Sequence, residues 1–168
     1  MYRLPFFHSN DWSNIKHGLC FDADCESYIF SNVGTYELLV ETEGCLGKGL
    51  MLGRKEITSS NQYIGEYTGI VKVYDENDSS NYNASLVEGQ FVIDAKDSFN
   101  VLKYCNHSCK PNAYLKVFRH FSEPRICMFS KGRIKPFSWI NICYCKGKGL
   151  KIFFKSKKCF CNSCLNNS

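Results

Sequence analysis

The sequence has little that would place the chain in a membrane or outside the cell. Its apolar runs fall well short of the roughly 18 residues that mark a membrane-spanning helix. The first residues, MYRLPFFHSNDW, lack the basic region and the following apolar stretch of a signal peptide. Asn-x-Ser/Thr sequons occur, but without an entry signal we interpret them as chance: Asn77, Asn83, Asn106 and Asn166. We therefore expect an intracellular protein.

The sequence also lacks a helical pattern and any internal repeat. No segment repeats apolar residues with a 3.6-residue period for more than two turns. Short runs rich in strand-forming residues occur instead, at 35–42, 61–74, 90–95, 113–121, 125–130 and 138–144. Glycines interrupt the stretch EGCLGKGLMLGRKEI, and the polar stretch 75–89 is predicted to be an insertion with at most a short helix. The expected fold is mostly β.

Length and composition fit one folded domain with small appendages. The chain has 168 residues, 44% of them hydrophobic and 15% aromatic, which argues against disorder. Its net charge of +5 is mild and forms no dense basic stripe of the kind that a dedicated nucleic-acid binder carries. We expect an irregular lead-in over residues 1–34, a main domain over 35–146 and a Lys- and Cys-rich tail over 147–168.

Eleven cysteines are an odd and high number for a chain of this size. Because no export signal is present, metal binding or buried thiols are better interpretations than a disulfide framework. The lead-in contributes Cys20 and Cys25, and the last part of the chain is rich in cysteine from Cys145 onward.

Three motifs stand out at wide separation: LGKGL (46–50), YCNHSCKPN (104–112) and INICY (140–144). Glycine permits close approach of a backbone to a ligand, although a plain β-turn would explain the first motif about as well. An Asn side chain offers both a donor and an acceptor, which suits an ammonium-carboxylate ligand. The alternative for the second motif is an Asx turn closed by Pro111, with His107 a hydrogen-bonded core histidine.

In this order and spacing, the motifs resemble the signature of the SET-domain protein-lysine methyltransferases. The resemblance covers about residues 35–164, and NHSCKPN is its most specific part. GEYTG (65–69) is similar to the family's Glu-Tyr-x-Gly strand, and FVIDA (91–95) is similar to the strand before its Asn-His motif. FVIDA and the tail FFKSKKCFCNSC are most similar to the branch that methylates lysine 9 of histone H3, with a truncated pre-SET region. The resemblance implies a SET-domain (β-clip) fold in which the Asn-His segment is threaded through a loop near Tyr144, an exception to the rule against threaded chains.

The resemblance also implies a site for S-adenosylmethionine and a lysine channel. Tyr144 would orient the substrate amine, and Tyr82 would line the channel and touch the cofactor. Other residues implied to bind the cofactor are Gly47, Lys48, Gly49, Lys103, Asn106, His107 and Phe160. For Tyr82, a place in the core or at the surface is the alternative, since the chain has 10 tyrosines.

A zinc site is implied where the tail meets the second motif. Cys109 would join Cys159, Cys161 and Cys164 in a tetrahedral thiolate set that fixes the tail over the active site. Separate buried or surface thiols are the alternative.

The chain departs from the family pattern at several positions. Two residues separate Cys161 from Cys164 where the family has four, and Lys103-Tyr104-Cys105 stands for the usual Arg-Phe-Ile. Ile142 and Cys143 replace the common Phe and Asp, and Asn83-Ala84-Ser85 replaces aromatic and acidic neighbours of Tyr82. These changes bear on activity and on the number of methyl groups added.

The function that the resemblance implies is methyl transfer to a lysine of a protein, expected to be a histone H3 tail in chromatin, in the nucleus. No membrane and no sequence-specific nucleic-acid partner is expected. The first alternative is a catalytically inactive SET-like module that binds a peptide or a chromatin partner. A zinc-stabilised nucleic-acid binder is a weaker one, because the lysines lack interleaved aromatic residues and no zinc-finger His spacing occurs.

Overall fold

The computed structural model describes residues 36–78, 80–87, 90–120, 123–144, 159 and 161. The expected lead-in 1–34 and most of the tail, with Phe160 and Cys164, lie outside the described residues, and so does part of the predicted threaded loop.

The described part of the chain is built from short strands, as predicted. Its strands are β1 (Leu38–Thr42), β2 (Lys48–Leu52), β3 (Tyr63–Tyr67), β4 (Ile70–Val73), β5 (Asn83–Val87), β6 (Phe91–Asp94), β7 (Asn106–His107), β8 (Ala113–His120), β9 (Glu123–Ser130) and β10 (Trp139–Ile142). Two 3₁₀ helices are described, η3 (Gly44–Leu46) and η4 (Val101–Tyr104). Among the described residues, no helix is long and apolar enough to cross a membrane.

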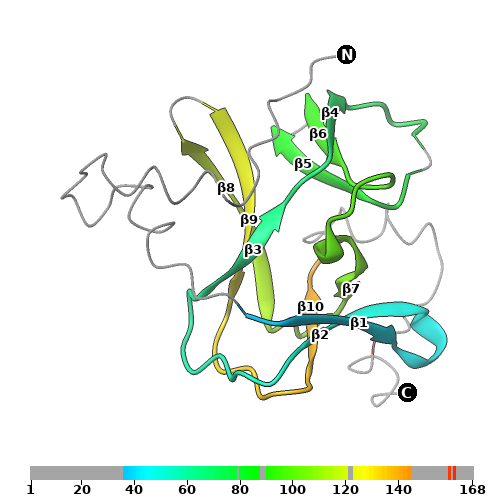
Figure 1. Cartoon of the computed structure of the whole chain (residues 1–168). Coiled ribbons are helices and arrows are strands. Elements are labelled where there is room, and N and C mark those ends of the chain that lie inside the picture. The colour runs from blue at the N-terminus through cyan, green and yellow to red at the C-terminus, as the bar shows by residue number, and fades with distance from the viewer. Residues whose placement is uncertain are drawn as a thin grey trace.

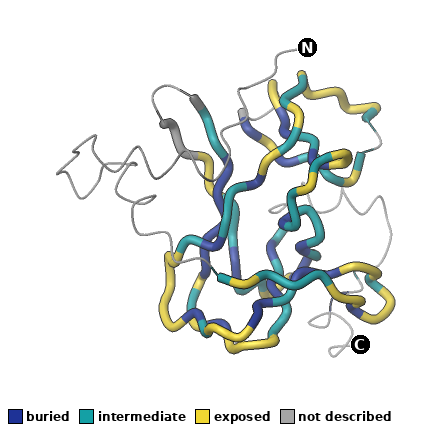
Figure 2. The backbone as a smooth tube through the Cα atoms, viewed as in Figure 1, coloured by how far each residue is buried: buried dark blue, intermediate teal, exposed yellow. Residues whose placement is uncertain are grey.

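The strands form three small sheets, which Figure 1 shows around a common centre. The first has four strands in the order β1-β2-β10-β7, the second has the order β3-β9-β8, and the third has the order β4-β6-β5. Figure 2 shows buried stretches along the strands in the middle of the molecule, with many of the exposed stretches in its outer loops. The core draws side chains from all three sheets, including Leu50, Ile140, Ile126, Met128 and Ile93. Burial of this apolar surface holds the sheets together.

The central pairing of the first sheet joins distant parts of the chain. Strand β10 pairs with β2 on one side and, in parallel, with β7 on the other, with Asn141 opposite Asn106 and Ile142 opposite His107. The side chain of Asn112 reinforces this pairing, because its Nδ2 donates to the carbonyl of Trp139 at 2.8 Å and its Oδ1 accepts from the amide of Asn141 at 2.9 Å. The Asn-His motif is therefore fixed beside the strand that leads to Tyr144.

Three strands, β2, β5 and the two-residue β7, were not predicted from the sequence. Strand β2 contains Gly49, and a Cβ at this position would lie 2.6 Å from Glu43 Oε2 and 2.9 Å from the ring of Trp139. Its glycine therefore makes room for neighbouring side chains within a regular strand. Strand β5 lies in the polar stretch that was predicted to be an insertion. There Ala84 and Leu86 are buried and alternate with polar neighbours, which hid the strand pattern.

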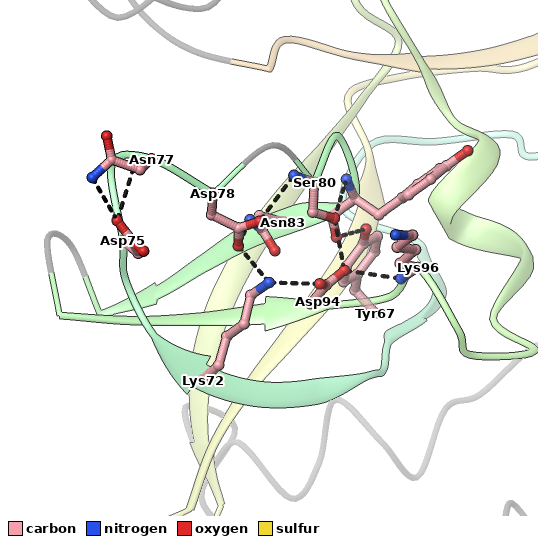
Figure 3. A network of polar contacts seen from close by, with 10 residues as sticks. Tyr67, Lys72, Asp75, Asn77, Asp78, Ser80, Asn83, Asp94 and Lys96 are labelled. Carbon is pink, nitrogen blue, oxygen red and sulfur yellow. Dashed lines mark hydrogen bonds and ion pairs between the residues drawn. The ribbon is translucent and has the colours of Figure 1, made fainter. Parts of the chain in front are cut away.

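Charged side chains connect the loop before β5 to the third sheet (Figure 3). Lys72 Nζ lies 2.6 Å from Asp94 Oδ2 and also contacts Asp78. Asn83 Nδ2 donates to Asp78 at 2.9 Å, and Ser80 Oγ donates to Asp94 at 2.9 Å. Hydrogen bonding from Lys72 lowers the pKa of Asp78. These polar contacts hold the loop that carries Tyr82 against the third sheet.

Replacement of Asn112 by alanine tests how much the side-chain bridge supports the central pairing. We expect Asn112→Ala to lower the free energy of unfolding by about 1–3 kcal/mol, because the carbonyl of Trp139 and the amide of Asn141 lose their partners. Urea titration followed by fluorescence measures the loss. Asn77→Ala, in an exposed turn, is the control and should change stability by less than about 0.5 kcal/mol. Equal stability of the two variants would contradict this role of Asn112.

Candidate functional site

A cavity of about 480 Å³ opens where the ends of several strands meet. Its lining combines apolar side chains with phenol, thiol and amine groups. Residues central to the site that line it are Tyr67, Leu102, Cys105, Ala113, Ile142 and Tyr144. An opening of this composition can hold an apolar chain that ends in a polar head.

Tyr144 follows β10 and lies against the Asn-His motif. Its hydroxyl donates to the carbonyl of Cys105 at 3.0 Å, and its backbone amide donates to His107 Nδ1 at 3.2 Å. The rings of Tyr144 and His107 lie 5.4 Å apart between centroids. The residue reaches the surface, but burial of its hydroxyl raises the pKa of Tyr144. Tyr144 therefore remains a neutral phenol.

Tyr67, on β3, is a site residue that the sequence analysis did not single out. Its hydroxyl donates to the backbone carbonyl of Tyr82 at 2.7 Å, and burial raises its pKa. After burial and Cys105, Tyr67 and Tyr82 are further causes of the raised pKa of Tyr144, so the three phenols lie near one another. The position of Tyr67 in the motif GEYTG was the signal that could have found it. The predicted role of Tyr82 at the cofactor stays a prediction.

The LGKGL motif, which runs from η3 into β2, lies beside Asn106, and its predicted role at the cofactor stays a prediction. Asn106 Nδ2 donates to the carbonyl of Lys48 at 3.1 Å and to Glu43 Oε2 at 2.8 Å. Gly47 has a φ of +80°, a conformation that favours glycine. Glu43 is a second residue that the sequence analysis missed, because its link to Asn106 spans 63 residues of sequence.

Lys103 lies at the other side of this region, on η4. Its ammonium group donates to the carbonyls of Ser98 at 2.7 Å and Lys96 at 3.0 Å. It also lies 5.8 Å from the ring centroid of Tyr82 and 5.3 Å from that of Tyr104. These contacts order the loop before η4, and the predicted contact of Lys103 with a cofactor stays a prediction.

A group of thiols and an imidazole lies next to the Asn-His motif. The ligand atoms of His107, Cys109, Cys159 and Cys161 lie within 4.8 Å of one another. Cys109 Sγ is 3.9 Å from Cys159 Sγ, and the amide of Cys109 donates to Cys161 Sγ at 3.5 Å. The three cysteines form no disulfide. This donor set fits zinc, which favours thiolate and imidazole ligands.

The hydrogen bonds of His107 favour a role beside the metal rather than on it. Because Nδ1 accepts the amide hydrogen of Tyr144, the proton of the neutral ring is on Nε2. Nε2 lies 3.4 Å from Cys109 Sγ and can donate to a thiolate there. A protonated nitrogen cannot ligate a metal, so of the described residues the three cysteines would be the ligands of a metal bound here. Cys164, the predicted fourth ligand, lies outside the described residues.

Comparisons with known proteins find similar sequences and a similar fold. Residues 47–145 match the SET domain family. The chain is 37% identical over 91 residues to the histone-lysine N-methyltransferase EZA1 of Arabidopsis thaliana, a match that covers 48% of this chain and 10% of that protein. It is 33% identical over 96 residues to the histone-lysine N-methyltransferase MEDEA of the same plant, covering 52% of this chain and 14% of that protein. These matches span about a tenth of the length of the curated relatives.

The fold has counterparts among solved structures. KRYPTONITE in complex with mCHG DNA and SAH matches with a TM-score of 0.58 and 22% identity, over 67% of this chain and 24% of that chain. KRYPTONITE with mCHH DNA, an H3(1-15) peptide and SAH matches with a TM-score of 0.59 and 21% identity, over 70% of this chain and 25% of that chain. These structures show a shared fold, and the predicted similarity to the histone H3 lysine 9 branch stays a prediction. Because the family model matches more than half of the chain, the chain belongs to the SET domain family.

Proposed function

We propose that the chain transfers a methyl group from S-adenosylmethionine to a lysine side chain of a protein, with a histone H3 tail as substrate. The curated relatives are named histone-lysine N-methyltransferases. The solved structures with this fold contain SAH, the demethylated form of the cofactor, and one contains an H3(1-15) peptide. A histone substrate also implies that the protein works on chromatin in the nucleus.

The observation that carries the proposal is the parallel pairing of β7 with β10. It brings the proposed cofactor-binding pair, Asn106 and His107, beside Tyr144 at the edge of the cavity. S-adenosylmethionine supplies an electrophilic methyl group on a sulfonium. The methyl donor would lie beside Asn106 and His107, and the lysine side chain would lie in the cavity beside Tyr144.

The cavity supports the chemistry that a lysine acceptor needs. A free lysine has a pKa of about 10.4, and only its neutral amine can attack a methyl group. Apolar side chains such as Leu102, Ala113 and Ile142 disfavour the charged ammonium form in the cavity. Tyr144 donates its own hydroxyl hydrogen to Cys105, so its oxygen is left to accept an N–H of the amine and orient the amine's lone pair.

A catalytically inactive peptide-binding module is the second candidate. One observation favours it, because the hydroxyls of Tyr67 and Tyr144 both donate to backbone carbonyls, as purely structural tyrosines would. In either case an extended peptide could be held by main-chain pairing at a strand edge. Turnover decides between the two candidates.

Loss of the Tyr144 hydroxyl tests the enzymatic proposal. We expect Tyr144→Phe to lower methyl transfer by about 100-fold or more, because the amine loses the group that orients it. Transfer of radiolabelled methyl groups from S-adenosylmethionine to core histones measures the effect. Tyr74→Phe removes a hydroxyl from an exposed residue and should act like the unmodified protein. Full activity of Tyr144→Phe would refute the role of this phenol, and no transfer by the unmodified protein would favour the inactive module.

The raised pKa of Tyr144 leads to a prediction for the pH dependence. Since the pKa is raised, the phenol stays protonated at a pH where a free tyrosine would ionise. We expect kcat/KM to rise with pH as the substrate lysine loses its proton, without a decline from Tyr144 up to about pH 10. Initial rates on an H3 peptide test this, with circular dichroism to show that the fold persists. A decline with an apparent pKa below 10 in the folded protein would contradict it.

We also propose that the thiol group next to the Asn-His motif holds one zinc ion. Cys109, Cys159 and Cys161 would ligate it, with Cys164 as the fourth ligand. Because Cys109 lies 50 residues of sequence before Cys159, the metal would tie the tail to the motif that carries Asn106 and His107. The predicted role of Phe160, covering the cofactor or channel, depends on such a connection.

Metal analysis tests the zinc proposal and the ligand set. We expect one zinc per chain by mass spectrometry and its loss in Cys161→Ser, since zinc loses a thiolate. Cys45→Ser removes an exposed thiol outside the group and should retain the metal. X-ray absorption should show a sulfur shell near about 2.3 Å without a nitrogen shell near about 2.0 Å. A nitrogen shell would make His107 a ligand and contradict the assigned proton position.

A further inference from the structure

Glu43 is a buried acid beside the proposed cofactor site. It precedes η3, and only 8% of its surface is exposed. Among the ion pairs of the described residues none involves Glu43. A buried carboxylate without a cation is unfavourable, because it loses hydration and gains no opposite charge. The position therefore favours a cationic ligand.

The local backbone is built to hold this carboxylate in place. The amide of Glu43 donates to the carbonyl of Gly47 at 2.7 Å, and the amide of Leu46 donates to the carbonyl of Glu43 at 2.9 Å. Gly49 has no side chain, and a Cβ there would lie 2.6 Å from Glu43 Oε2. The turn between β1 and β2 thus fixes the backbone of Glu43, and β2 leaves space for its side chain.

Asn106 presents an acceptor rather than a donor to a ligand. Both hydrogens of its Nδ2 have partners, Glu43 Oε2 at 2.8 Å and the carbonyl of Lys48 at 3.1 Å. Exchange of the amide oxygen and nitrogen would turn the oxygen toward these two acceptors, so the assigned orientation is the favourable one. The amide oxygen of Asn106 remains for a ligand. Together with the Glu43 carboxylate, it offers two acceptors and one negative charge.

We propose that Glu43 binds the α-ammonium group of S-adenosylmethionine, together with the amide oxygen of Asn106. An ammonium group supplies both a positive charge and several donors, which a neutral or anionic ligand group does not. The inference rests on the proposed function, because it assigns a role to Glu43 within the same cofactor site. The proposal also predicts that the ammonium group, rather than the carboxylate, binds at this position, because Glu43 and Asn106 both offer acceptors.

When bound, S-adenosylmethionine would bring a second positive charge, that of its sulfonium. After burial, the charge of Glu43 is a further cause of the raised pKa of Cys105, and it also contributes to that of Tyr144. The carboxylate therefore influences the reacting end of the site as well. S-adenosylhomocysteine keeps the ammonium group but has a neutral sulfide, so comparison of the two ligands separates the two possible partners of Glu43.

Calorimetric titration of the full chain tests the proposal without a measurement of activity. The variants are Glu43→Gln, which can keep the hydrogen bond to Asn106, and Glu41→Gln, which removes an exposed charge from the neighbouring strand β1. The ligands are S-adenosylmethionine, S-adenosylhomocysteine and an S-adenosylhomocysteine analogue with hydrogen in place of the α-amino group. We expect Glu43→Gln to weaken binding of the first two ligands alike, by about 10- to 100-fold.

The analogue completes a double-mutant cycle. Removal of the amino group should weaken binding to the unmodified protein and to Glu41→Gln by a similar factor, and should have little further effect on Glu43→Gln. Thermal unfolding of the ligand-free variants checks that they fold, and Glu43→Gln should be at least as stable as the unmodified protein because it loses an unpaired buried charge.

Two results would overturn the role of Glu43 while leaving the proposed function intact. One is binding of S-adenosylhomocysteine to Glu43→Gln with unchanged affinity. The other is a loss of affinity for S-adenosylmethionine alone, which would assign the carboxylate to the sulfonium. If the unmodified protein bound neither S-adenosylmethionine nor S-adenosylhomocysteine, the proposed function itself would fail together with this inference.

Discussion

The parallel pairing of two residues of β7 with β10 is the contact on which the site depends. It places Asn106 opposite Asn141 and His107 opposite Ile142, although 35 residues separate the members of each pair. Two residues give few hydrogen bonds, so the pairing relies on help from the Asn112 side chain and from the amide of Tyr144 bonded to His107. Through this pairing, the Asn106–His107 segment contacts both the backbone of Lys48 and the backbone of Tyr144.

His107 connects two parts of the site, Tyr144 and the group of thiols. One ring nitrogen accepts from the backbone of Tyr144, and the other faces the thiol of Cys109. The neutral ring carries one proton, so when Nδ1 accepts from Tyr144, Nε2 is the nitrogen that donates toward Cys109. Burial lowers the pKa of His107, which favours the neutral ring that this arrangement needs. A single side chain therefore contacts both Tyr144 and the thiol group proposed to hold zinc.

Short strand-like runs predicted the mostly β fold, and the family resemblance of the specific motif NHSCKPN implied its meeting with Tyr144. They did not predict β5, whose polar residues on one face hid the buried Ala84 and Leu86. Nor did they find Glu43, an acid in a glycine-rich turn whose burial follows only from the distant Asn106 and Trp139. Tyr67 was quoted within a motif, but its hydroxyl contact with the carbonyl of Tyr82 depends on packing between sheets. Contacts of this kind leave no periodic signal along the chain.

The order of strands in the first sheet has a consequence for how the protein is made. Strand β10 is the last strand described, yet it lies between β2 and β7, which precede it in the chain. During synthesis, β2 and β7 leave the ribosome before β10 does. Their edges therefore stay unpaired with β10 until Trp139–Ile142 emerges and pairs with both. Pairings between such distant segments slow folding, because a long loop must close before they form. The nascent chain therefore has a period in which the edges of β2 and β7 are open to other strands, a state in which a chaperone would help most.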